Sequence, residues 1–158
     1  MKENPKYDTA EDKTHLVLVN GIVVKGNKIL ISKRAEHEPH QPGKWTIPGG
    51  KVERTQGNIF NVFEDTLTRE VEEETGVKIK PEVTLLTNNT FIRSTGQHVI
   101  ALTFLSYWES GEAVHLEDTS AVEWIGGSEL GDFEFAPNVD LYIKMGFDYI
   151  KAHDTENN

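Results

Sequence analysis

The sequence contains no cysteine and no long apolar run. Without cysteine the chain can form no disulfide and no thiolate metal site, and it has no cysteine nucleophile. Its longest apolar stretches, near Leu16–Val19 and Val99–Leu105, are far shorter than the ~20 residues that cross a bilayer, so we expect no membrane segment. The lack of cysteine is typical of the reducing cytoplasm, where we expect the protein to act.

Basic residues are also scarce, because 16 Lys and Arg stand against 26 Asp and Glu and give a net charge of −10. A nucleic-acid-binding surface needs clustered Lys and Arg, so we expect no nucleic-acid partner. A chain of 158 residues is long enough for one domain with its own core. We expect this domain over residues 14–151, with flexible polar segments at residues 1–13 and 152–158.

Apolar runs and turn signals predict two helices and several strands. The first helix, over residues 61–75, has an apolar face formed by Phe60, Phe63, Leu67 and Val71, and the second follows Pro137. Hairpin turns are expected at residues 26–27 and 94–97. Strands are expected over residues 15–24, 29–31, 45–47, 83–87, 90–93, 98–108 and 121–125. This order predicts an α/β (α+β) fold, a sandwich of helices around a mixed sheet.

The first helix carries an unusual acidic cluster. Glu70, Glu73 and Glu74 lie at i, i+3 and i+4, so they share one helix face, and their repulsion has to be offset by protons or by cations. Hard oxygen ligands favour Mg²⁺ or Mn²⁺. The alternative is a solvated helix face. Arg69 at the head of the cluster and the tight turn of residues 48–51 favour a site.

Together, Gly50 and the run Arg69–Val77, led by Trp45–Gly49, resemble the Nudix box, G-x5-E-x7-R-E-U-x-E-E-x-G-U with U aliphatic. The second half of the box matches at every fixed position, and the resemblance covers roughly residues 14–150. It implies a MutT-like Nudix hydrolase with an α/β/α sandwich around a central mixed sheet.

The first half of the box departs from the pattern. Eighteen residues separate Gly50 from Arg69, five more than in the family, and the extra residues fall within 54–60. The first glutamate of the box is replaced by Asn61, or by Asn58 if Gly57 is the box glycine. Asn is itself a good helix N-cap, so we expect the helix to persist and the preceding loop to change shape.

The resemblance also implies roles for individual residues. Glu70, Glu73 and Glu74 would bind Mg²⁺, with Mn²⁺ as a substitute, and the carbonyl of Gly49 would complete the coordination. Arg69 would orient Glu70 by a charge-assisted hydrogen bond, and Glu70 would accept the proton of the attacking water.

Weaker signals concern the remaining ligand and the substrate. Many family members add an acid from a loop, which here is Glu117 or Asp118, and a solvent-exposed loop acid is the alternative. Arg34 and Lys51 could face substrate phosphates, whereas Lys33 is better explained as a solvated strand end. Asn138 could contact the base, as in the MutT-like branch, or could cap the second helix. His37 and His40 lack a third ligand nearby in sequence, so zinc is not expected.

We therefore expect a Mg²⁺-dependent hydrolase that cleaves a diphosphate bond in a nucleoside di- or triphosphate, including oxidised nucleotides, as a monomer or homodimer. Alternatives are a hydrolase of another nucleoside diphosphate derivative, such as ADP-ribose or a nucleotide sugar, and a non-catalytic nucleotide sensor. Residues 92–94 lack the Pro and Tyr typical of the ADP-ribose and related branches. An isopentenyl diphosphate isomerase of the same fold would need a cysteine, and a DNA-reading domain would need a basic face.

Overall fold

The computed structural model describes residues 14–153, and its strands and helices follow the predicted order. Two helices of equal length, α1 (Val62–Thr75) and α2 (Val139–Ala152), are accompanied by the short 3₁₀ helix η2 (Gly127–Asp132). The strands are β1 (Leu16–Lys25), β2 (Lys28–Arg34), β3 (Trp45–Thr46), β4 (Gly49–Lys51), β5 (Lys78–Ile79), β6 (Thr84–Ile92), β7 (His98–Ser110) and β8 (Thr119–Ile125).

The strands form one mixed sheet. Its main path runs β3-β2-β1-β7-β5, with β4 paired to β1, β6 to β7 and β8 to β2. The central pair β1 and β7 is parallel, in register from Leu16 opposite Val99 to Val24 opposite Tyr107, and the other pairs are antiparallel. The predicted mixed sheet is therefore confirmed.

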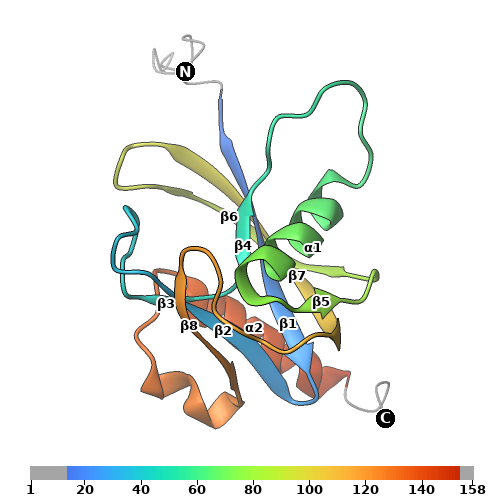
Figure 1. Cartoon of the computed structure of the whole chain (residues 1–158), viewed down its shortest axis with the longest axis vertical. Coiled ribbons are helices and arrows are strands. Elements are labelled where there is room, and N and C mark those ends of the chain that lie inside the picture. Colours follow the sequence, from blue (N-terminus) through green and yellow to red (C-terminus); the bar gives the residue numbers. More distant parts are fainter. Residues whose placement is uncertain (1–13, 154–158) are drawn as a thin grey trace, which may run out of the picture.

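The two helices cover opposite faces of this sheet (Figure 1). Side chains of β1 point to both faces of the sheet. Val19 and Val23 pack in the core under α1, and Ile22 and Val24 pack in the core under α2. Side chains of a strand point alternately to its two faces, so one apolar strand can fill both layers. The predicted α/β/α sandwich is confirmed.

The apolar face of α1 is narrower than the sequence predicted. Leu67 and Val71 are fully buried, but Phe63 is 36% exposed and Phe60 is 76% exposed. Phe60 lies before the helix, in the irregular residues 52–61 that contain the extra residues. This segment projects from the body of the molecule between β4 and α1 (Figure 1), which explains why its apolar side chains miss the core.

Several local predictions need correction. Residues 84–92 form one strand rather than two, with a register shift between Leu85 and Thr87. In the first hairpin turn only Gly26 has a positive φ, of 62°. Asn61 is the N-cap of α1, but its backbone has the left-handed conformation, with φ 60°, and its side chain makes no capping hydrogen bond. The Gly76 terminus of α1 is as expected, with φ 75°.

The ends of the described chain bear on two further expectations. Helix α2 continues through Ala152, and the backbone N–H of His153 donates to the carbonyl of Tyr149, so the helix reaches into the segment expected to be a tail. Residues 1–13 and 154–158, the rest of the expected flexible ends, lie outside the described residues. Within residues 14–153, neither helix has the length and apolar character that crossing a bilayer demands.

Candidate functional site

The divergence of β1 and β2 opens the site. These strands pair only beside their hairpin, at Val24–Ile29 and Lys25–Lys28, and further along β1 pairs with β4 while β2 pairs with β3. A cavity of about 440 Å³ lies there. Its lining comes from β1, β2, β3, β4, the end of β6 and the start of α2, and Glu74 of α1 also contributes.

Two glycines bring β4 against the acidic face of α1. The backbone N–H of Gly49 donates to Oε2 of Glu74 at 3.1 Å. A Cβ at position 50 would lie 2.4 Å from Cδ of Glu70, and a Cβ at position 49 would lie 2.3 Å from the carbonyl oxygen of Val19. A Cβ at position 49 would meet rigid backbone, whereas a Cβ at position 50 would meet only the movable end of the Glu70 side chain. Residues 49–51, which the sequence predicted to be part of a turn, form the strand β4, and its two glycines pack directly on two of the three glutamates.

The three glutamates differ in their surroundings. Glu74 lies on the cavity wall and Glu70 is largely buried, with 17% of its side chain exposed, whereas Glu73 is exposed. Nη2 of Arg69 lies 3.5 Å from Oε1 of Glu70, so the expected arginine contact is present at the outer limit of hydrogen-bond distance.

Burial and mutual repulsion hold protons on this cluster. Burial raises the pKa of Glu74 from 4.5 to about 8, aided by the charge of Glu70 and opposed by the Gly49 N–H and the charge of Arg34. The pKa of Glu70 is also raised, chiefly by burial, with Arg69 opposing and Glu73 adding to the shift. A site that binds protons this strongly favours positive charge at the same place.

The loop before β8 carries two acidic residues with different partners: Glu117 interacts with the glutamate cluster, and Asp118 contacts His37. The negative charge of Glu117, which has a left-handed φ of 49°, contributes to the raised pKa of both Glu70 and Glu74. Asp118 instead lies 3.3 Å from Nε2 of His37 and lines the cavity. Of the two candidates, Glu117 is therefore the one that interacts with the glutamates.

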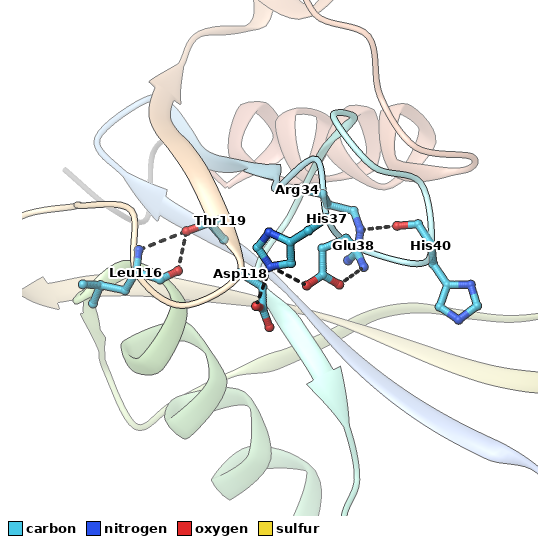
Figure 2. Close-up of polar contacts among 7 residues, drawn as sticks. All are labelled: Arg34, His37, Glu38, His40, Leu116, Asp118 and Thr119. Atoms are coloured by element: carbon cyan, nitrogen blue, oxygen red, sulfur yellow. Dashed lines mark hydrogen bonds and ion pairs between the residues drawn. The ribbon is translucent and has the colours of Figure 1, made fainter.

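Arg34 is held by the loop that follows β2. Its Nη2 lies 2.9 Å from Oε2 of Glu38, and its Nε donates to the carbonyl of His40 at 2.6 Å (Figure 2). His37 of the same loop reaches across to Asp118. Arg34 lines the cavity. The residue predicted to contact phosphate therefore lies at the site, where it is ion-paired with the carboxylate of Glu38.

Lys51 and Asn138, the other predicted substrate contacts, also line the cavity. Asn138 is the N-cap of α2, but its backbone has the left-handed conformation, with φ 72°, and its side chain makes no capping hydrogen bond. The capping alternative is therefore not realised through the side chain. Lys33, the weaker candidate, is not part of the cavity lining.

Sequence reasoning missed Arg93 and Glu38. Arg93 lines the cavity from the end of β6, and burial, followed by the charge of Arg34, lowers the pKa of its guanidinium. No described residue forms an ion pair with Arg93. A basic residue at a hairpin end is common, and β6 and β7 form a local hairpin. The long-range pairing of β7 with β1 brings this hairpin beside the cavity, and this pairing could not be seen in the local sequence.

One compact group of metal-ligand types occurs among residues 14–153, and it is not the glutamate cluster. Ligand atoms of His37, Glu38 and Asp118 lie within 4.8 Å of one another. Arg34 is ion-paired with Glu38, which places a positive charge where a cation would bind. No third ligand for His37 could be recognised from the sequence because Asp118 is 81 residues away.

The donors of the glutamate cluster fit a hard divalent cation. They are carboxylate oxygens, they repel one another, and Gly50 leaves no side chain between β4 and Glu70. The ligand atoms of Glu70, Glu73 and Glu74 do not form a group as compact as that around His37. A bound cation would therefore draw these side chains together.

Comparisons with known proteins identify relatives of this chain. The family model of the NUDIX domain matches residues 14–143. An ADP-ribose pyrophosphatase of Methanocaldococcus jannaschii is 32% identical over 119 residues, which cover 75% of this chain and 66% of that protein. A Mycobacterium tuberculosis protein, provisionally named 8-oxo-dGTP diphosphatase 2, is 26% identical over 129 residues, covering 77% of this chain and 80% of its own length.

Among solved structures, the MutT NUDIX hydrolase of Burkholderia pseudomallei superposes with a TM-score of 0.68 at 27% identity. The superposition covers 84% of this chain and 98% of that one. The family model spans most of the chain, and the fold agrees with the resemblance found in the sequence. The chain therefore belongs to the NUDIX domain family, the Nudix hydrolases.

Proposed function

We propose that this protein is a Mg²⁺-dependent hydrolase that cleaves a diphosphate bond in a nucleoside triphosphate or another nucleoside diphosphate derivative, with Mn²⁺ as a substitute. The observation that carries the proposal is a cavity lined by a partly buried glutamate and three basic side chains: Glu74, Gly49 and Gly50 border it, and Arg34, Lys51 and Arg93 also line it. Carboxylates suit a divalent cation, and arginine and lysine suit phosphate oxygens.

In this proposal Glu70, Glu73, Glu74 and the carbonyl of Gly49 hold the cation, with Glu117 as a further ligand. When bound, the cation neutralises charge on the diphosphate oxygens and acidifies the attacking water. Water oxygen bonds to phosphorus, the bond to the bridging oxygen breaks, and Glu70 accepts the water proton.

The other proposed roles follow from placement around the cavity. Arg69 keeps the Glu70 carboxylate oriented, and Arg34 and Lys51 bind the phosphates. Asn138 contacts the base through its side-chain amide, which makes no capping hydrogen bond to α2. The proposed working form is a cytoplasmic monomer or homodimer acting on small molecules rather than on nucleic acid, and light scattering of the purified protein measures the assembly.

A substrate panel tests the reaction. ADP-ribose, 8-oxo-dGTP and dGTP are incubated with Mg²⁺, with Mn²⁺ or with EDTA, and released phosphate, pyrophosphate and nucleoside monophosphate are quantified. We expect cation-dependent turnover of at least one compound, and strongly reduced turnover by Glu73→Gln. Binding without turnover of any compound would favour the nucleotide-sensor alternative. Equal turnover by Glu73→Gln would contradict the proposed metal ligands.

ADP-ribose is the second substrate class to consider, because the relative at 32% identity is named for that activity. The two classes leave different products. Cleavage of a nucleoside triphosphate between the α- and β-phosphates releases pyrophosphate, whereas cleavage of ADP-ribose releases AMP and ribose phosphate. Product identity in the same panel therefore separates them.

The two glycines of β4 permit a paired test that separates the position of Glu70 from the stability of the fold. In Gly50→Ala the new methyl displaces the flexible end of Glu70, so we expect roughly 10²-fold lower turnover at nearly unchanged melting temperature. In Gly49→Ala the methyl meets the rigid carbonyl of Val19, so we expect a lower melting temperature. Calorimetry and initial rates on both variants measure this contrast. Wild-type turnover by Gly50→Ala would refute the role given to Glu70.

A further inference from the structure

A buried hydroxyl on the cavity wall has no partner. Ser32 of β2 is 1% exposed, its Oγ makes no hydrogen bond to any described residue, and it lines the cavity. A hydroxyl removed from water without a compensating hydrogen bond is unfavourable. Such a group in a cavity wall therefore indicates a ligand that supplies the missing bond.

Comparison with the other buried hydroxyls of the described chain singles out this residue. Thr66, Thr75 and Ser106 each donate to a backbone carbonyl, at 2.7, 2.6 and 3.4 Å. Thr103 is the other buried hydroxyl without a partner, and it does not line the cavity. Ser32 alone among these combines burial, an unpaired oxygen and a place on the wall.

The backbone fixes Ser32 in place. It lies in the middle of the sheet, opposite Thr46 of β3 on one side and Val122 of β8 on the other. A residue paired on both sides keeps its side chain on one face of the sheet, so the hydroxyl cannot move to the opposite face without breaking strand pairing. Thr46, which also lines the cavity, directs its own hydroxyl to the carbonyl of Ile47 at 3.4 Å and so does not supply the bond.

The character of the hydroxyl indicates which part of a substrate it contacts. The cavity already offers Arg34, Lys51 and Arg93 to anionic groups. Ser32 is neutral, and the same cavity has apolar walls formed by residues including Ile47, Phe91 and Val139. A flat, neutral ring system with a few hydrogen-bonding atoms suits such walls better than a diphosphate does.

We propose that the Ser32 hydroxyl forms a specificity-determining hydrogen bond to the nucleoside part of the substrate. This inference rests on the proposed function, since it assumes a nucleotide in the cavity. A site that hydrogen-bonds a polar atom of its ligand discriminates against analogues that lack this atom, because its own buried group is then left unpaired. Ser32 accordingly selects among nucleosides and contributes little to binding of the diphosphate.

The variant Ser32→Ala tests this inference through two effects of opposite sign. Without ligand we expect the melting temperature to rise by about 2–4 °C, because the unpaired hydroxyl is gone. The affinity for AMP or dGMP, whichever binds wild type more tightly, is expected to fall about tenfold. The affinity for pyrophosphate with Mg²⁺ is expected to stay within twofold. Calorimetric titration measures each constant without requiring turnover.

Two variants serve as matched controls. Thr103→Val removes the other unpaired hydroxyl and is expected to raise the melting temperature while leaving AMP and dGMP affinities unchanged. Ser106→Ala removes a paired hydroxyl and is expected to lower the melting temperature. Unchanged nucleotide affinity in Ser32→Ala, an equal loss for pyrophosphate, a lowered melting temperature, or no binding of either nucleotide to wild type would overturn the inference.

The readouts keep this inference separate from the proposed function. If wild type binds AMP or dGMP but hydrolyses no compound of the panel, the hydrolase proposal fails, while a selective loss in Ser32→Ala still supports the nucleoside contact. If hydrolysis is present but Ser32→Ala binds nucleotides as wild type does, the nucleoside contact fails and the hydrolase proposal stands.

Discussion

Replacement of Glu70 by Gln is expected to lower kcat for a diphosphate substrate by about 10²–10⁴-fold, the contribution typical of a general base. The amide keeps the shape of the carboxylate beside Gly50 but cannot accept the water proton. Because the side chain is nearly isosteric, the melting temperature should change little. Initial rates over a range of pH, with Mg²⁺ saturating, measure the effect.

Glu72→Gln is the matched control for this experiment. Glu72 belongs to the same helix and the same acidic run, but it is exposed, and Oε1 of Glu72 lies 4.0 Å from Nζ of Lys78, outside the cavity lining. We expect wild-type kcat for this variant. A loss of less than tenfold in Glu70→Gln, or an equal loss in both variants, would mean that Glu70 is not the base and that Glu117 should be examined next.

The second large effect concerns stability at pH 8 in the absence of divalent cations. The unfolded chain releases the Glu74 proton near pH 4.5, whereas burial raises the pKa in the folded protein to about 8. Between these values the unfolded state binds fewer protons, so each pH unit lowers the free energy of unfolding by up to about 1.4 kcal/mol from this group. The contribution of Glu74 is thus most favourable below pH 4.5 and is lost by about pH 8.

Glu74→Gln is expected to remove this dependence, because glutamine does not titrate and its carbonyl oxygen can still accept the Gly49 N–H. In EDTA the variant should therefore be more stable than wild type at pH 8 and similar near pH 5. Mg²⁺ should stabilise wild type at pH 8 much more than the variant. Urea unfolding at both pH values, with EDTA or Mg²⁺, measures these differences. Parallel pH curves for the two proteins would contradict the prediction.

Local sequence was enough to predict the parts of the site that one segment builds. The spacing of Glu70, Glu73 and Glu74 fixes their common face, and Gly76 ends their helix in a left-handed conformation that favours glycine. The two glycines that let the chain approach this helix were equally visible, although residues 49–51 form strand β4 rather than the predicted turn. These features depend on helix periodicity and on backbone freedom, which neighbouring residues determine.

The features that the sequence did not reveal depend on distant segments. Ser32 became buried and unpaired only because β3 and β8 both pair with β2, and Glu38 and Asp118 met only because their loops do. Phe60 and Phe63 have the sequence spacing of residues on a buried helix face, but both lie outside the core because the segment before α1 is irregular. Periodicity predicts a face, but only tertiary packing decides how far along the chain this face is covered.

The parallel pairing of β1 with β7 has a consequence for the order in which the protein folds. The ladder joins Leu16 to Val99, so about eighty residues have to be enclosed before it can form. Closing such a loop costs entropy before any contact repays it, and proteins dominated by distant pairings fold slowly. The β1–β2 hairpin is local in sequence, whereas the cavity-lining strands β1 and β6 are joined only through β7. The cavity is therefore complete only after the long-range ladder has closed.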